Sequence, residues 1–268
     1  MRRVARRLRT VAAELSPRAR AAQPHRGRPC RAGQPPGRDR LPRQGDYAGA
    51  RVTAIDLSRA SLAYAWRKAE ELGISNITCL HGDILDLDAL DRQFDIVIST
   101  GVLHHMADPE EGWRALCRRL RPNGLMKIAL YSEIARQDIV RLRAEIAEAG
   151  IGASPDAMRD FRARLMAMPD LADSVFARSS DFYSLSAFRD LVFHVQEHRF
   201  TIPSIASALD RLGLAFCGFE MAGQHSLAAF RARHPQGDAL LDLDLWHAFE
   251  TDHPMTFAGM YQFWCQKE

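Results

Sequence analysis

The chain has 268 residues and 47% of them are hydrophobic, so it is long enough for one large α/β domain with a sizeable core. Its net charge of +3 conceals a division, because residues 1–45 contain 13 Arg, no Lys and two acidic residues, while acidic residues outnumber basic ones in the rest. No apolar run approaches the ~20 residues of a membrane span, and no apolar segment follows the basic start as in a secretory signal. We therefore expect a cytoplasmic protein.

Residues 1–45 form an Arg- and Pro-rich leader. Residues 2–15 have the pattern of a short basic amphipathic helix. Residues 16–45 hold six Pro and four Gly, and almost no apolar side chain larger than Ala. Such a segment cannot bury enough surface to offset the entropy lost on ordering, so we expect disorder. Contact with nucleic acid and an organelle transit peptide are alternatives that we regard as less well supported.

Strands and helices alternate from Arg51 onward. The segment RVTAIDL is typical of a buried parallel strand, and Ser58 of the N-cap of a helix that ends near Leu72. Pro109 predicts the first turn of another helix, after Asp108. The other expected elements are strands at 76–83, 94–100, 125–133, 215–222 and 259–267, and helices at 203–214 and within 224–254. The alternation predicts an α/β fold with a doubly wound, mostly parallel sheet.

Residues 134–199 interrupt this alternation. They have a helical pattern without a clear strand, and they are too numerous for an ordinary connection. We interpret them as a helical cap inserted into a domain of residues 46–268.

Two acidic residues follow neighbouring predicted strands. Asp56 ends the first strand, at the position where open α/β sheets bind ligands, and a carboxylate there can accept hydrogen bonds from both hydroxyls of a ribose. Asp83 follows the second strand and suits the amino group of an adenine. Each residue could instead cap the following turn or helix.

A longer run then points to a family. The run is FDIVISTGVLHHMADPEEGWRALCRRLRPNGLMKIALYSE, and with AIDLS and HGDIL it resembles the class I S-adenosylmethionine-dependent methyltransferases, which have a Rossmann-like fold. The segments LYSEIARQDIV, DFYSLSAFRDLVFHVQEHRFTIPSI and DLDLWHAFETDHPMTFAGMYQFW look like the methyltransferase domain at the carboxyl end of bacterial tetratricopeptide-repeat methyltransferases. The resemblance covers residues 47–268 and implies methyl transfer from S-adenosylmethionine to an unidentified small molecule or peptide.

The resemblance also implies the site residues. It places Asp56 and Leu57 at the cofactor ribose, and Asp83 and Ile84 at the adenine. It places Ser99, Thr100, Gly101 and Val102 on the methionine side of the cofactor. His104 or His105 would face the reacting centre, where an imidazole of nearly neutral pKa can take a proton from the acceptor. Either histidine could instead be structural.

We expect no metal. The five cysteines form no CxxC pair. His194 and His198 are spaced as neighbours on a helix face, but no third ligand is evident, so substrate contact or helix packing is the better interpretation.

One part of the family pattern is missing. The family begins with a central strand that leads into a glycine-rich loop close to the cofactor. The leader offers neither, and Pro35 and Pro36 would interrupt a strand there. We therefore expect no first strand, with a frameshift or mispredicted start favoured over a divergent leader, and weak or absent cofactor binding. The alternative functions are a non-catalytic remnant that serves as an interaction module and a nucleotide-dependent oxidoreductase.

Overall fold

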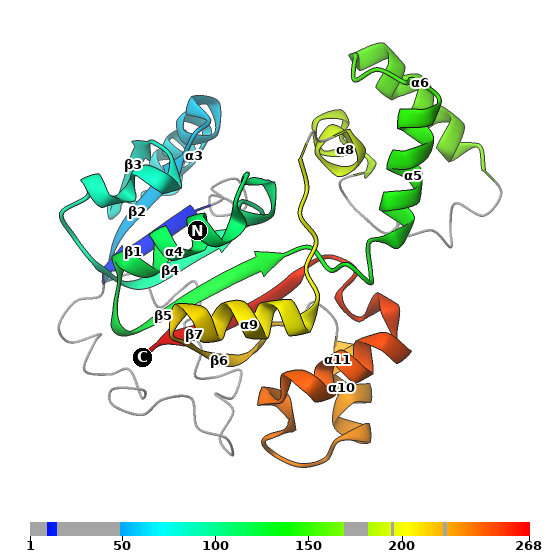
Figure 1. Ribbon diagram of the computed structural model, residues 1–268. Coiled ribbons are helices and arrows are strands. Elements are labelled where there is room, and N and C mark those ends of the chain that lie inside the picture. The colour runs from blue at the N-terminus through cyan, green and yellow to red at the C-terminus, as the bar shows by residue number, and fades with distance from the viewer. Residues whose placement is uncertain (1–9, 15–48, 169–181, 194–195, 222–223) are drawn as a thin grey trace.

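The computed structural model describes residues 10–14, 49–168, 182–193, 196–221 and 224–268. Its centre is a seven-stranded sheet with the order β3-β2-β1-β4-β5-β7-β6 (Figure 1). The strands are β1 (Thr10–Glu14), β2 (Arg51–Asp56), β3 (Ile77–His81), β4 (Phe94–Thr100), β5 (Leu120–Leu130), β6 (Leu214–Phe219) and β7 (Tyr261–Lys267). The predicted α/β fold with a doubly wound sheet is confirmed.

Strand directions place the carboxyl ends of four strands together. β2 pairs with β3 and β4 pairs with β5 in parallel, whereas β1 runs antiparallel to both β2 and β4. Because β2 and β4 each oppose β1, they run in the same direction. β2, β3, β4 and β5 therefore end on one side of the sheet, which we call its carboxyl end. β7 is antiparallel to β5 and β6, as expected for a closing strand.

The expectation that the central strand is absent is wrong. β1 occupies the place between β2 and β4, although its sequence, TVAAE, lies within the segment predicted to be helical. An unfilled centre would leave two strands with unpaired backbone groups, and pairing with both outweighs a local helical pattern. Small and β-branched side chains suit a strand covered on both faces. Residues 16–45, which were expected to be irregular, lie outside the described residues.

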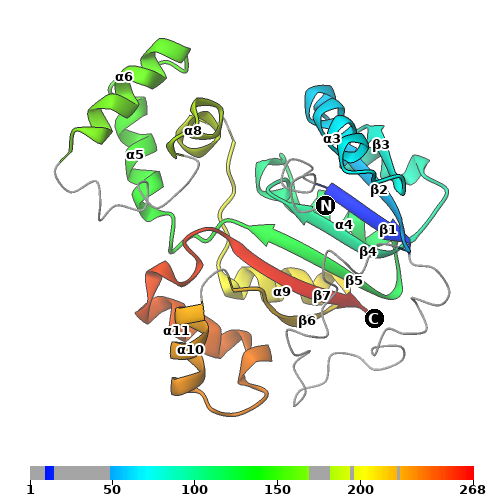
Figure 2. The ribbon, with the colours of Figure 1, turned by 180° about the vertical axis from the view of Figure 1, so that it is seen from behind.

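Helices cover the two faces of the sheet (Figures 1 and 2). On one face α4 (Pro109–Arg119) and α9 (Ile202–Leu212) share a core with Ala12 of the central strand and Trp113. On the other face α3 (Arg59–Glu71) packs on β2 through Leu62 and Ala65. Their starts follow the sequence, since Ser58 caps α3 and Asp108 caps α4 through side-chain acceptors for backbone N–H groups.

Three helices of the segment between β5 and α9 stand apart from the sheet in both views (Figures 1 and 2). They are α5 (Gln137–Glu148), α6 (Pro155–Met166) and α8 (Leu185–Val192). They have a hydrophobic core of their own, in which Phe161, Phe182 and Phe188 meet.

The carboxyl-terminal part adds helices that pack near the edge of the sheet formed by β6. They are α10 (Gln224–Arg233), α11 (Leu243–Asp252) and the short 3-10 helices η6 (Ala239–Leu241) and η7 (Pro254–Phe257). Phe230 stacks on Trp246 at 3.6 Å between ring centroids, and both are buried in the main core. This packing joins α10 and α11 to the sheet, because Phe219 of β6 also contacts Trp246.

Candidate active site

The predicted site residues gather at the carboxyl end of the sheet. Asp56 is the last residue of β2, and Ser99 and Thr100 end β4. Asp83 and Ile84 follow β3, at the start of the 3-10 helix η2 (Ile84–Ala89). The loop after β4 carries the remaining residues, Gly101, Val102, His104 and His105, into the 3-10 helix η3 (Leu103–His105).

The two carboxylate oxygens of Asp56 have different surroundings. Oδ1 accepts a hydrogen bond of 2.8 Å from the backbone N–H of Ser58, so the residue does act as a cap. Oδ2 is buried and has no hydrogen-bond partner in the part of the chain that the structure describes. A buried carboxylate oxygen without a partner is costly in the free protein and suits a ligand that brings hydroxyl donors. The capping interpretation therefore holds for Oδ1, whereas the ribose interpretation concerns Oδ2.

Leu57 lies beside this carboxylate and its side chain is 65% exposed. A single exposed apolar side chain is normal on a protein surface, so exposure by itself assigns Leu57 no role. The Leu57 carbonyl also contacts Nε2 of His81 at 3.1 Å, which ties the end of β2 to the end of β3. The loop after β2 thus presents an apolar surface in a fixed position.

Asp83 caps the start of η2. Its Oδ1 accepts a hydrogen bond of 3.0 Å from the N–H of Leu85. The neighbouring Ile84 is buried in the main core, which anchors the turn. The capping interpretation therefore holds for Asp83.

Two residues with buried hydroxyl groups lie side by side on neighbouring central strands. Thr10, the first residue of β1, lies in register with Ser99 of β4 and Ile55 of β2. The hydroxyls of Thr10 and Ser99 are buried and have no hydrogen-bond partner among the described residues. Ser99 was predicted as a site residue from the sequence. Thr10 was not, because only the reversed direction of β1 brings it to the carboxyl end.

The loop after β4, residues 101–106, which we call the histidine loop, begins at a glycine with left-handed backbone conformation. Gly101 has a φ of +72°, which favours glycine, and a Cβ placed there would meet nothing within 4 Å. His104 is completely buried and stacks on Tyr131 with 3.8 Å between ring centroids. His105 is half-buried, and its Nδ1 lies 3.0 Å from the carbonyl oxygen of Gln196. The loop therefore buries one histidine and leaves the other at its surface.

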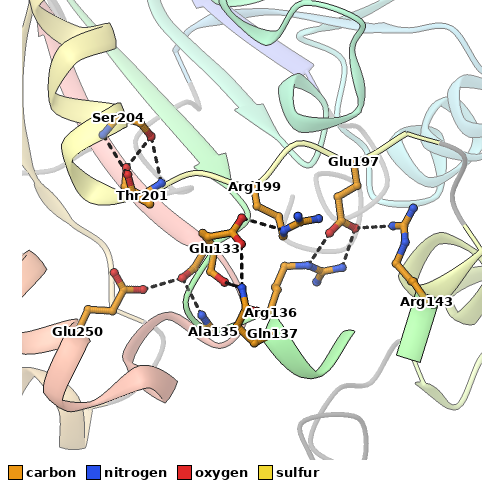
Figure 3. Close-up of polar contacts among 11 residues, drawn as sticks. Glu133, Ala135, Arg136, Gln137, Arg143, Glu197, Arg199, Thr201, Ser204 and Glu250 are labelled. Atoms are coloured by element: carbon orange, nitrogen blue, oxygen red, sulfur yellow. Dashed lines mark hydrogen bonds and ion pairs between the residues drawn. The ribbon is translucent and has the colours of Figure 1, made fainter. Parts of the chain in front are cut away.

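A buried carboxyl group lies where the chain leaves β5 (Figure 3). Glu250 of α11 accepts hydrogen bonds from the hydroxyls of Ser132, at 2.6 Å, and Tyr261, at 2.6 Å to the nearer oxygen. Burial raises the pKa of Glu250 above its usual value of 4.5, although both hydrogen bonds lower it. Burial and the nearby Glu250 carboxylate also raise the pKa of Tyr261. No sequence pattern indicated this cluster, because its members are far apart in the chain.

An open groove of about 490 Å³ lies beside this cluster. It separates the start of α5 from η7, so it is bordered by the helical segment and by the carboxyl-terminal part. Its lining residues are Glu133, Ile134, Ala135, Gln137, Asp138, Arg141, Pro254 and Met255.

A metal site is not evident in the described ranges, where no three His, Cys, Asp or Glu residues are grouped to hold an ion. The idea that His194 and His198 share a helix face is not supported, because α8 ends at Val192 and His198 lies in a non-helical segment. His194 itself is outside the described residues. No described helix is long and apolar enough to cross a membrane.

Residues 36–128 match the family model described as "Methyltransferase domain". An uncharacterized protein of Synechococcus sp. is 29% identical over 182 residues, which are 63% of this chain and 43% of that protein. A ubiquinone biosynthesis O-methyltransferase of Methylobacterium sp. is 32% identical over 88 residues, 33% of this chain and 35% of the enzyme. The chain thus spans less than half the length of these relatives.

Among solved structures, PKMT2 from Rickettsia typhi is similar over 81% of this chain and 43% of its own, with a TM-score of 0.56 and 13% identity. At this identity the likeness shows the fold. The residues that match the methyltransferase domain contain β2, β3 and β4 with the loops that follow them. The sequence match and the structural likeness therefore concern the same part of the sheet. Residues 36–128 are therefore similar to a methyltransferase domain, and the chain has an α/β fold of the Rossmann-like kind found in methyltransferases.

Proposed function

We propose that this protein transfers a methyl group from S-adenosylmethionine to a small-molecule or peptide acceptor. The observation that carries the proposal is the buried, unpartnered Oδ2 of Asp56 at the end of β2, inside the residues that match a methyltransferase domain. The buried hydroxyls of Thr10 and Ser99, at the same end of the sheet, also support the proposal because they too have no hydrogen-bond partner among the described residues. A nucleoside with a charged amino-acid tail supplies donors and acceptors for all three groups.

Within this proposal each predicted residue has a role. Asp56 accepts hydrogen bonds from the ribose hydroxyls, and Leu57 packs on the adenosine. Asp83 and Ile84 hold the adenine. The residues at the end of β4 and after it, Ser99, Thr100, Gly101 and Val102, line the methionine side.

His105 is the better candidate for the general base. A carbonyl oxygen only accepts, so Nδ1 of His105 donates to Gln196, and Nε2 then carries the lone pair that can take a proton. His104 is buried and stacked, which suits a supporting role. When bound, the cofactor supplies a methyl group on a sulfonium that is already a good donor. The protein's part is to align the acceptor, exclude water and remove its proton.

We also propose a domain of residues 46–268 with the helical segment 134–199 as a cap over the acceptor. The separate core of α5, α6 and α8 supports this division. The groove between α5 and η7 is a space where an acceptor can enter. A cytoplasmic location remains our expectation.

The test is calorimetric titration of the full chain with S-adenosylhomocysteine. Asp56→Ala removes a charge-assisted contact and should weaken binding by about 2 to 3 kcal/mol, or about 30- to 150-fold. Asp91→Ala, which removes an exposed carboxylate before β4, is the matched control and should bind as the unaltered protein does.

Two outcomes would contradict the proposal. Equal dissociation constants for Asp56→Ala and the unaltered chain would leave Asp56 with its capping role alone. A folded chain that binds no cofactor would favour the non-catalytic interaction module.

A further inference from the structure

We propose that Glu197 is a positioning residue for His105. It holds the backbone carbonyl of Gln196 against Nδ1 of His105 and so sets which ring nitrogen carries the proton. The inference rests on the proposed function in one respect, which is that His105 serves as the base. The segment that does this work, residues 196–200, returns from the helical segment to the sheet.

The returning segment contacts the histidine loop at three points. The Gln196 carbonyl oxygen lies 3.0 Å from Nδ1 of His105. The Gln196 side-chain amide donates to the carbonyl of Met106 at 3.1 Å, and the N–H of His198 donates to the carbonyl of His104 at 2.7 Å. Because these contacts join the segment to the loop, any shift of the segment moves the acceptor of the His105 proton.

The same segment is fixed to the exit of β5. The N–H of Phe200 donates to the carbonyl of Tyr131 at 2.8 Å, and the N–H of Glu133 donates to the carbonyl of Phe200 at 2.7 Å. Arg199 pairs with Glu133 at 2.9 Å. The segment thus lies between two loops that both leave the carboxyl end of the sheet.

Glu197 is the buried anchor of this arrangement (Figure 3). Its side chain is 1% exposed and receives two hydrogen bonds from Arg136, at 3.0 and 2.8 Å. Arg143 of α5 adds a third contact at 3.2 Å. A bidentate pair with a planar guanidinium fixes orientation as well as position, and a buried carboxylate cannot be left without it. The side chain of Glu197 therefore holds the neighbouring Gln196 backbone.

Arg136, which binds Glu197, is also linked to His104 through the ring of Tyr131. The guanidinium of Arg136 lies 3.6 Å from the centroid of the Tyr131 ring, and this ring also stacks on the ring of His104. His105 meets the Tyr131 ring edge at 5.8 Å. Glu197 thus acts on both histidines, on His105 through the backbone of Gln196 and on His104 through Arg136 and Tyr131.

The consequence is chemical. In water the neutral imidazole favours the form with the proton on Nε2. In that form Nε2 has no free lone pair and cannot act as a base. The Gln196 carbonyl stabilises the opposite form, with the proton on Nδ1, and leaves the Nε2 lone pair for the acceptor. Loss of the anchor should return His105 toward its preference in water.

The test is nuclear magnetic resonance of the full chain with ¹⁵N-labelled histidine rings. His105→Ala identifies the ring signals of His105. In the unaltered protein we expect the neutral ring to be protonated mainly on Nδ1. In Glu197→Gln we expect this form to fall below half of the neutral population, while the dissociation constant for S-adenosylhomocysteine stays the same.

Two arginine variants on α5 distinguish the loss of a Glu197 contact from general damage to the fold. Arg143→Gln removes one contact to Glu197 and should shift the His105 proton in the same direction, though less. Arg141→Gln, two residues away, removes a surface pair with Asp138 and should leave the proton in place. Because Arg143→Gln keeps the Arg136 pair, it remains informative if Glu197→Gln does not fold.

The result that overturns the inference is a ring protonated on Nε2 in the unaltered protein, or an unchanged ring in both Glu197→Gln and Arg143→Gln. Neither result depends on cofactor binding. A protein that fails to bind S-adenosylhomocysteine but shows the expected ring shifts would reject the proposed function and retain the positioning role.

Discussion

At the scale of single residues, two adjacent histidines have different environments. His104 is completely buried against Tyr131, whereas His105 is half-buried and donates through Nδ1 to the chain 91 residues later. The sequence limits the candidates for the general base to these two histidines but does not distinguish between them. The choice depends on Gln196, whose contact with the loop exists only in the folded protein.

The first prediction follows from this difference. His105→Ala should lower the rate of methyl transfer by about 10²-fold, because a positioned base of that kind is lost. The dissociation constant for S-adenosylhomocysteine should stay nearly the same. The measurement is the initial rate of transfer of labelled methyl groups into acceptors from a cell extract at saturating cofactor. Full activity of His105→Ala would make this histidine structural.

At the scale of elements, one buried carboxyl group joins three parts of the fold. Glu250 of α11 accepts hydrogen bonds from the hydroxyl of Ser132 after β5 and from that of Tyr261 at the start of β7. Burial raises the pKa of this carboxyl above 4.5. In the unfolded chain the group ionises at its ordinary pKa, so the folded state holds its proton to higher pH.

The second prediction concerns pH. The contribution of Glu250 to the free energy of unfolding is complete below about pH 4.5 and is lost as the pH rises through the raised pKa of the folded state. Glu250→Gln cannot ionise, so its stability relative to the unaltered protein should increase as the pH rises from about 4.5 through the raised pKa of the folded state. Urea unfolding at several pH values measures this difference. Glu148→Gln, at the exposed end of α5, should show no such trend, and a flat difference for Glu250→Gln would contradict the account.

The elements also show what the sequence could predict. β2, β4, α3 and α4 follow from local signals, namely apolar β-branched runs and the caps Ser58 and Asp108. β1 does not, because five residues beside an Arg-rich segment have no strand signal strong enough to outweigh a helical pattern. Its place and its reversed direction are set by the partners on both sides, which a local pattern does not contain.

At the scale of the whole molecule, the fold brings together residues that are distant in the chain. Parallel strands align Asp56, Asp83 and Ser99 at one end of the sheet, so the predicted cofactor residues could be grouped from strand order alone. Thr10, Glu197 and Glu250 could not, because a reversed strand, a returning segment and a distant helix bring them there. Local patterns thus predict which residues end the parallel strands better than they predict residues that a reversed strand, a returning segment or a distant helix brings to the same region.

The central claim is that the carboxyl end of the sheet binds S-adenosylmethionine. The most direct measurement is hydrogen exchange of the full chain, followed by residue-resolved analysis, with and without saturating S-adenosylhomocysteine. The account predicts slower exchange at Leu57, at residues 82–85 and at residues 100–105, because a ligand there covers the loops after β2, β3 and β4. Binding without protection in these loops, or protection confined to α5, α6 and α8, would contradict it.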